Sequence, residues 1–312
     1  MYSEVNMKEN FRELYARLYN ENITELEELR AKEKKTSLTL VFAIVGIFLF
    51  GIINPLFVII GMVAIVIYSI KSSKNNMPNV QSRGKTYREV FKEKIVGPII
   101  ENSFGSAKYD ARAGISSFEY NKSGYREHYD RYRSEDLIIA PLSVEGEVST
   151  FMTIAEVHTE RESTDSDGNR SHTTVFHGLT SSFLLPKNLE KNIYIRSNGR
   201  VIGWNKSKVK MDMPEFEKIF DVESNDAILT MRVLTADVMT EMIELYKKYK
   251  FRFEINILQD TIYMRLWTGN MFEPNVFKHS MEYKLIEHYY LVLKALTSIA
   301  SHIYDTVAKI EI

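Results

Sequence analysis

The sequence predicts an α+β protein with N-terminal helices, a two-helix transmembrane hairpin, and then a cytoplasmic domain of antiparallel hairpins packed with helices. Three observations lead to this class. Residues 36–70 hold no charged side chain, whereas the rest of the chain is rich in charge. Alternating apolar and polar residues flank turn signals in the second half, and apolar residues recur at helical spacing near both ends. A long C-terminal helix completes the expected order.

The composition excludes several classes of function. The 312 residues include 40 Lys and Arg against 41 Asp and Glu, a balance that argues against a general nucleic-acid binder. The chain contains no cysteine, so disulfides, thiolate nucleophiles and sulfur metal ligands are ruled out. A hydrophobic content of 45% is enough for a buried core and excludes wholesale disorder.

Residues 4–35 are expected to form two helices. The first has an apolar stripe at three-and-four spacing, made of Phe11, Leu14, Tyr15 and Leu18. The polar residues 20–22 predict a break, after which Thr24 and Glu27 have the spacing of a capping box that starts the second helix. Because apolar stripes usually pack within their own chain, we expect this one to dock on the cytoplasmic domain. A partner protein or the membrane surface is the alternative.

The uncharged block 36–70 predicts insertion into a lipid bilayer. One straight helix over the whole block would be about 52 Å long, which exceeds a hydrocarbon core of about 30 Å. Asn54-Pro55 lies near the middle, and proline removes a backbone donor and disfavours helix geometry in the residue before it. We therefore expect two short spans, 38–53 and 56–70, joined by a tight turn. Since each is near the lower length limit, a re-entrant wedge and a buried soluble hairpin stay as alternatives.

Basic residues flank the block on both sides: Arg30, Lys32, Lys34, Lys35, Lys71, Lys74, Arg83 and Lys85. By the positive-inside rule, both termini lie in the cytoplasm and the turn at 51–55 lies outside. The lysines can also attract anionic headgroups, although topology alone accounts for them. A cleaved signal peptide fits poorly, because a long charged segment precedes the block. The expected parts are N-terminal cytoplasmic helices 1–35, a transmembrane hairpin 36–70, a linker 71–85 and a cytoplasmic α+β domain 86–312.

The cytoplasmic domain is expected to begin with a helix over residues 86–100 that Pro98 ends. Strands then follow. Residues 148–160 and 173–185 flank a turn signal at 165–169, where Asp167-Gly168 favours a hairpin. The first hairpin is therefore expected to close at this pair.

A second hairpin joins residues 251–258 to 261–267 through Gln259-Asp260. One register satisfies both faces, with apolar pairs on one side and an oppositely charged pair on the other. The expected pairs are Phe253 with Leu266, Ile255 with Met264, Ile257 with Ile262, and Glu254 with Arg265.

Helices are expected on each side of the second hairpin. Thr235 has the chemistry of an N-cap for a helix that runs to about residue 249. The C-terminal helix, about 277–307, carries a heptad seam made of Ile286, Tyr289, Leu293, Leu296, Ala300, Ile303 and Val307. We expect this seam to pack across the sheet, and a homodimer through the helix is the alternative.

Several short motifs resemble the bacterial domain-of-unknown-function family three-one-three-seven. They are Tyr129-Asp130-Arg131-Tyr132, Ser134-Glu135-Asp136-Leu137-Ile138, Ala155-Glu156-Val157-His158, Thr174-Val175-Phe176-His177-Gly178-Leu179, the run 215–222, Leu229-Thr230, Leu234-Thr235 and Phe272-Glu273-Pro274. Their order, from about Tyr87 to the end, carries the resemblance more than any single motif. It implies a multi-pass protein of the bacterial inner (cytoplasmic) membrane and hints at a LemA-type membrane protein as a partner. It implies no catalytic residue.

One constellation of residues has the chemistry of a metal site. If the first hairpin folds symmetrically about Asp167-Gly168, His158 lies opposite His177, and Glu156 and Glu160 share the face of His158. Two imidazoles with a carboxylate such as Glu156 can hold a catalytic zinc. A register slip of one residue would send one histidine to the other face, and paired exposed histidines without a metal are the more common case.

Two interpretations of function follow. The first is a membrane-anchored cytoplasmic binding or scaffold protein that acts through protein or membrane-surface contacts. The alternative is a membrane-anchored metal-dependent hydrolase that uses the cross-strand histidine pair. We find no phosphate loop, nucleophile elbow or zinc-protease helix, no catalytic residue set and no cofactor motif, which favours the first. The aromatic and basic run 125–133 is balanced by nearby acidic residues, so nucleic acid is not an expected partner.

Overall fold

The structure is a computed structural model that describes residues 2–53, 58–61, 63, 64, 67, 84–197 and 208–311. The chain divides into two compact units. Unit 1 comprises residues 1–98 and 273–287, and unit 2 comprises residues 99–272 and 288–312.

Unit 1 begins with one long helix, α1 (Tyr2–Ile53). The predicted break at residues 20–22 is wrong: the Asn22 side chain donates to the Leu18 carbonyl at 3.0 Å and is buried, so it supports the helix instead of competing with it. Thr24 caps nothing, because it lies inside the helix. The predicted stripe does pack within the chain, since the Phe11 ring meets that of Tyr283 at 5.4 Å and Phe11, Leu14 and Leu18 are buried.

The second helical region starts where the sequence predicts and continues past the predicted end. Thr86 caps α3 (Tyr87–Phe91) through a complete capping box with Glu89. The helix then widens into a π-turn, η1 (Lys92–Val96), and runs on as α4 (Gly97–Phe104). Pro98 therefore does not end it, because the π-turn shifts the hydrogen bonds, with Gly97 N–H donating to Lys92 O, and makes room for a residue without a donor.

The block predicted to enter the membrane is partly described. Residues 38–53 are helical within α1, and residues 58–61, 63, 64 and 67 are helical as well. Asn54-Pro55 and most of the predicted linker 71–85 lie outside the described residues. No helix in the described part of the chain is long and apolar enough to cross a membrane.

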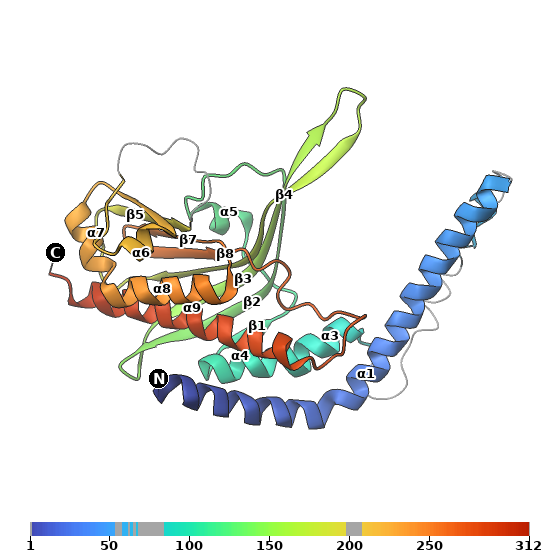
Figure 1. Ribbon diagram of the computed structural model, residues 1–312, viewed down its shortest axis with the longest axis horizontal. Coiled ribbons are helices and arrows are strands. Elements are labelled where there is room, and N and C mark those ends of the chain that lie inside the picture. The colour runs from blue at the N-terminus through green and yellow to red at the C-terminus, as the bar shows by residue number, and fades with distance from the viewer. Residues whose placement is uncertain are drawn as a thin grey trace. The chain divides into compact units, whose positions relative to one another are not determined.

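Unit 2 contains an eight-stranded antiparallel sheet in the order β1-β2-β3-β4-β8-β7-β5-β6 (Figure 1). The strands are β1 (Lys108–Asp110), β2 (Arg131–Val144), β3 (Glu147–Thr164), β4 (Arg170–Leu184), β5 (Asn192–Ser197), β6 (Phe220–Ser224), β7 (Phe253–Leu258) and β8 (Thr261–Leu266). Together with the helices, this sheet confirms the α+β class.

Both predicted hairpins are present. In β7 and β8 all four predicted pairs hold, including Glu254 opposite Arg265. In β3 and β4 the strands are longer than predicted and close at the predicted turn, where the Asp165 carboxylate accepts the N–H groups of Asp167 and Asn169. Local turn chemistry is therefore enough to set the β7–β8 register, whereas the β3–β4 register also depends on a shift between Thr159 and Glu160.

Unit 2 also contains helices. They are residues 99–104 of α4, α5 (Ser117–Asn121), α6 (Pro214–Glu217), α7 (Ala227–Val233), α8 (Ala236–Tyr249) and the part of α9 (Tyr283–Lys309) from His288 onward. α8 and this part of α9 lie side by side along one face (Figure 1), and Glu241 joins them by accepting from Ser298 and pairing with His302. The predicted cap at Thr235 is confirmed, since its side chain accepts from Val238 N–H.

The C-terminal helix starts later than predicted, at Tyr283 instead of about residue 277. The residues before it form turns, because the Asn275 side chain accepts the Phe277 N–H and Glu27 accepts the Ser280 N–H. All seven seam residues of the helix are buried within the chain. A homodimer through this helix stays a prediction and would have to use its other face.

Candidate functional site

The predicted histidine pair meets on the sheet of unit 2. His158 of β3 lies directly opposite His177 of β4, as the symmetric hairpin predicts. The two rings stack with centroids 4.2 Å apart and planes 18° from parallel. Their side chains are 26% and 29% exposed, so both rings can be reached from solvent.

Carboxylates lie on both sides of the stacked rings. Glu156 is buried, and one of its oxygens accepts the Met271 N–H at 3.0 Å while the other lies 3.5 Å from His177 Nε2. On the far side, His158 Nε2 lies 3.7 Å from a Glu160 oxygen and 3.2 Å from the Thr174 hydroxyl. The four side chains therefore form a row across two strands, with the two imidazoles in the middle and a carboxylate at each end.

The surroundings of one ring favour its neutral form. Burial, and secondly the neighbouring His177, lower the pKa of His158 below its ordinary value. Neutral imidazoles and a carboxylate are donors that zinc accepts. The stacked geometry, however, points the in-plane lone pairs of the two rings along parallel planes, so a shared ion requires one ring to turn. Zinc at Glu156, His158 and His177 stays a prediction.

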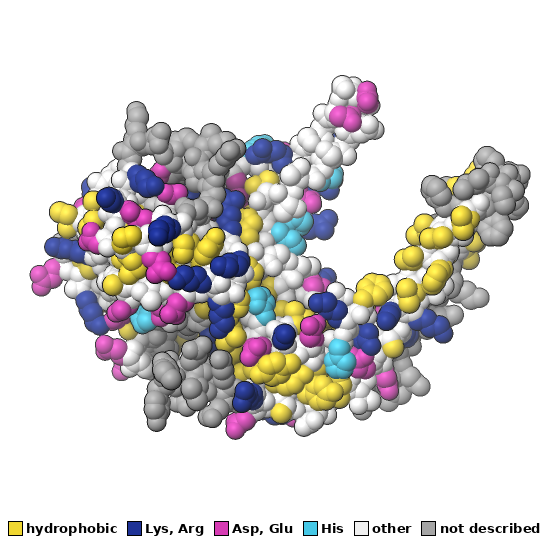
Figure 2. Space-filling view, viewed as in Figure 1, with side chains coloured by type: hydrophobic (Ala, Val, Ile, Leu, Met, Phe, Trp, Pro, Cys, Tyr) yellow, Lys and Arg dark blue, Asp and Glu magenta, His cyan; other side chains and the backbone are white. Residues whose placement is uncertain are grey.

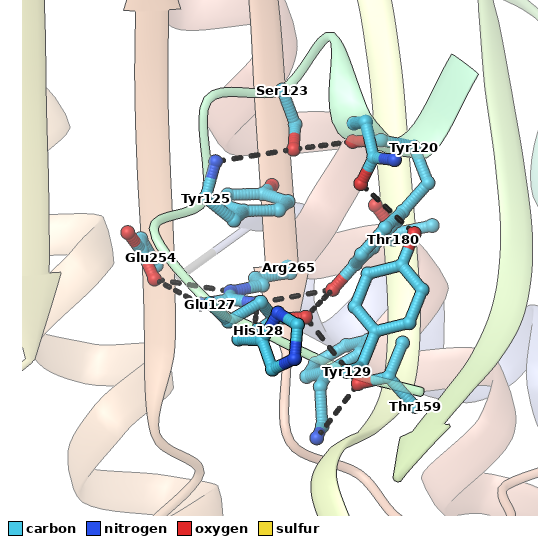
Figure 3. Close-up of polar contacts among 12 residues, drawn as sticks. Tyr120, Ser123, Tyr125, Glu127, His128, Tyr129, Thr159, Thr180, Glu254 and Arg265 are labelled. Atoms are coloured by element: carbon cyan, nitrogen blue, oxygen red, sulfur yellow. Dashed lines mark hydrogen bonds and ion pairs between the residues drawn. The ribbon is translucent and has the colours of Figure 1, made fainter. Parts of the chain in front are cut away.

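Arg265 lies at the centre of a buried charge network that the sequence predicts only in part (Figure 3). Its Nε and Nη2 donate to one Glu254 oxygen at 3.0 and 2.8 Å. Its Nη1 donates to Glu127 at 2.5 Å and to the Tyr120 hydroxyl at 3.0 Å. The second Glu254 oxygen lies 2.6 Å from Arg196 Nη2. Glu127 comes from a segment whose sequence carries no signal for this contact.

Aromatic rings enclose the Arg265 guanidinium. Its central carbon lies 4.0 Å from the Tyr125 ring centroid, 4.6 Å from that of Trp267 and 5.2 Å from that of Phe176. Tyr125 and Phe176 belong to a core cluster with Tyr120 and Val157, against which Tyr129 and Tyr132 also pack. The tyrosines of the run 125–133 therefore edge the core.

Burial and neighbouring charges determine the pKa values in this network. Burial alone would lower the pKa of Arg265, and the carboxylates of Glu254 and Glu127 more than offset it, so the pKa is raised. Burial raises the pKa of Tyr120, and that of Tyr132 to about 12. The guanidinium is thus permanently charged, and four of its five N–H donors have partners in Glu254, Glu127 and Tyr120, an arrangement that holds the α5 segment on the sheet.

Comparisons with known proteins add one family. The model of the family described as "Protein of unknown function (DUF3137)" matches residues 174–304, which confirms the family resemblance over this segment. No curated protein matches the chain. Among solved structures, the mycobacterial trehalose monomycolate transport factor A shows a likeness with a TM-score of 0.34 and 5% identity, covering 69% of this chain and 97% of that one. A likeness of this size carries no argument about fold or function.

Proposed function

Because residues 174–304 carry the domain of a family whose description gives no function, we propose from the chain itself that the protein is a membrane-anchored binding or scaffold protein. In this proposal, residues 36–70 form a helical hairpin in the bacterial cytoplasmic membrane. Both termini lie in the cytoplasm, and the α+β unit contacts a partner protein or the membrane surface there.

The observation that carries the proposal is a run of exposed apolar side chains with no charge among them. In the described part of residues 36–70, ten large hydrophobic side chains are between 36% and 70% exposed: Leu38, Val41, Phe42, Ile44, Val45, Leu49, Ile59, Ile60, Val63 and Ile67. Exposed apolar surface costs about 25 cal/mol per Å² in water, and no such cost arises among lipid chains. A bilayer therefore suits this segment better than water does.

The contact between the two arms supports a hairpin. A Cβ atom placed on Gly61 would lie 2.3 Å from Ile47 Cγ1, so the backbone at Gly61 runs close against the Ile47 side chain. Both residues are seven positions from Asn54, the relation expected for antiparallel arms with a turn at Asn54-Pro55. Small residues at close helix contacts are common in membranes.

A projecting ribbon supports the binding role. β3 and β4 continue beyond their neighbours, and in the strand ladder of the described residues the stretch 161–173 pairs only with itself (Figure 1). At its base, Arg161 donates to the His128 carbonyl and the Glu162 N–H donates to Asp130. An isolated two-stranded ribbon gains little stability in water. Exposed polar side chains on both of its faces suit contact with a partner surface.

Membrane insertion is tested with single cysteines in the cysteine-free chain. We expect the full-length protein to stay in the membrane pellet after alkaline carbonate washing. A Ser166→Cys variant should react with an impermeant maleimide only after the cells are opened, because residue 166 is expected in the cytoplasm. An Ile53→Cys variant, placed at the predicted outer turn, is the matched control. Release by carbonate would refute the anchor, and labelling of Ser166→Cys in intact cells would reverse the topology.

The second candidate is the metal-dependent hydrolase, favoured by the observed register of the histidine pair. Purified full-length protein should then contain zinc, and His158→Ala and His177→Ala should each lose it. His172→Ala is the matched control, since this histidine is exposed on the same hairpin. A metal-free wild-type protein that binds no added zinc would remove this candidate.

A further inference from the structure

A patch of cations and aromatic rings lies at the end of α8 and continues into β7. We call it the α8-end patch and define it by Tyr246, Lys248, Tyr249, Lys250, Phe251 and Arg252. The three cations are exposed and the three rings are half-buried. In the space-filling view, Lys and Arg side chains lie over α8 beside apolar surface (Figure 2).

The three cations of the patch have no carboxylate partner. Lys247 next to them is paired with Glu215, whereas Lys248, Lys250 and Arg252 form no ion pair with any described residue. Each of them lies over an aromatic ring instead. Lys248 Nζ is 5.5 Å from the Tyr249 centroid, Lys250 Nζ is 5.6 Å from that of Tyr246, and Arg252 Cζ is 4.4 Å from that of Trp267.

The helix dipole does not account for the whole patch. It favours cations in the last turn, which explains Lys247 and Lys248. It does not explain Arg252, which follows the helix. Tyr249 and Phe251 stack 5.6 Å apart and both meet the His288 ring edge-on, and the two rings are still half exposed. Unpaired cations together with half-exposed aromatic rings suit the boundary between water and lipid headgroups.

We propose that the α8-end patch docks unit 2 on anionic phospholipid headgroups. This inference rests on the proposed function, because the anchor in residues 36–70 keeps the patch near a membrane whose headgroups carry the complementary charge. Nucleic acids and acidic proteins are negatively charged like these headgroups and are the alternative partners. A chain with a net charge of −1 does not favour nucleic acid, and neither class explains the half-exposed rings.

The test uses the full-length protein in nanodiscs of phosphatidylcholine, with and without phosphatidylglycerol. Lysine acetylation, read by mass spectrometry, should be at least about threefold slower at Lys248 and Lys250 in the anionic discs, and high salt should remove the protection. Lys191 and Lys210 are exposed internal controls whose reactivity should not change. Equal reactivity in both discs overturns the proposal.

A variant pair separates docking from other effects. In Lys248→Glu/Lys250→Glu, protection of Arg252 from phenylglyoxal by anionic discs should be lost, whereas Lys191→Glu/Lys210→Glu should keep it. Protection by added nucleic acid or an acidic protein but not by anionic lipid would also overturn the proposal. If the chain does not enter nanodiscs at all, the anchor has failed. In that case, protection of Lys248 and Lys250 by phosphatidylglycerol vesicles tests the patch independently of the anchor: protection supports docking, and no protection overturns it.

Discussion

At the residue scale, buried charge is the feature with the largest energetic consequence. Arg265 is 6% exposed, and its two carboxylate partners, Glu254 and Glu127, are 2% and 8% exposed. A buried ion pair adds little stability compared with apolar packing, but removing one partner leaves an uncompensated charge. The network therefore constrains the α5 segment more than it strengthens the core.

We predict that Arg265→Met lowers the free energy of unfolding by about 3–5 kcal/mol, because it leaves the buried Glu127 without its cation and Glu254 with Arg196 alone. Thermal unfolding of the full-length protein followed by near-UV circular dichroism measures this. Arg170→Met is the matched control, since Arg170 pairs with Glu162 at the exposed ribbon and should change stability by less than about 1 kcal/mol. Equal effects of the two variants would contradict the structural role of the network.

Glu27 in unit 1 makes stability depend on acidity. Partial burial would raise its pKa, but hydrogen bonds from Arg30 and from the Ser280 N–H outweigh it and lower the pKa from 4.5 to about 2. Because the folded-state pKa is lowered, the stabilisation is present above the unfolded value of 4.5 and is lost as the pH falls toward 2.

Replacing Glu27 by Gln should therefore cost about 1 kcal/mol near neutral pH, a modest value because the pair is partly exposed. The difference from the wild type should shrink as the pH falls from 4.5 toward 2. Urea denaturation midpoints of the wild type and of Glu27→Gln, measured across this pH range, test this prediction. Glu28→Gln, on the same helix and exposed, should show no such pH-dependent difference.

At the element scale, the packing of the proposed hairpin gives the sharpest test. Gly61→Ala should destabilise the hairpin, since its Cβ would meet Ile47 at 2.3 Å. Gly46→Ala is the matched control, because nothing lies within 4 Å of a Cβ there. Protease resistance in nanodiscs reports the difference, and Ile47→Ala should rescue Gly61→Ala. Equal behaviour of the two glycine variants would argue against close contact of the arms.

Elements set by local chemistry are the ones that the sequence predicts well. The β7–β8 register follows from a two-residue turn and matched faces, and the capping of α3 and α8 follows from Thr86 and Thr235. The continuity of α1 does not follow, because the capping box at Thr24 and Glu27 is a local signal that tertiary contacts override: Glu27 bonds Ser280 instead. Strands β1, β5 and β6 also escape prediction, since their partners are set by long-range order in the sheet. β2 is missed as well, although it joins β3 through the two-residue turn Glu145-Gly146.

The same distinction applies to the site residues. His158 and His177 lie opposite each other as the count from the turn predicts, but this register also needs the shift between Thr159 and Glu160, which the count does not include. Only the Glu254–Arg265 half of the buried network is predictable in that way. Glu127 and Tyr120 reach Arg265 across more than 130 residues, and no local pattern encodes such a contact.

At the scale of the whole molecule, the proposed function assigns membrane location and partner contact to two different segments. Residues 36–70 account for location in the proposed function, and the ribbon 161–173 accounts for contact. The two are far apart in the sequence, so each can be removed without touching the other.

We therefore predict that crosslinking the tagged full-length protein in its native membrane captures a stoichiometric partner, for whose identity the family resemblance gives only a hint of a LemA-type membrane protein. Replacing residues 162–172 by Asn-Gly should leave the strands paired at Arg161 and Thr173, because this dipeptide closes two-residue hairpins. The shortened variant should keep its membrane location and its melting temperature and lose the partner. Capture that survives the shortening would move the contact to another surface. No capture by the wild type would instead favour a lipid, small-molecule or metal role, with the face of His158 and His177 as the next site to test.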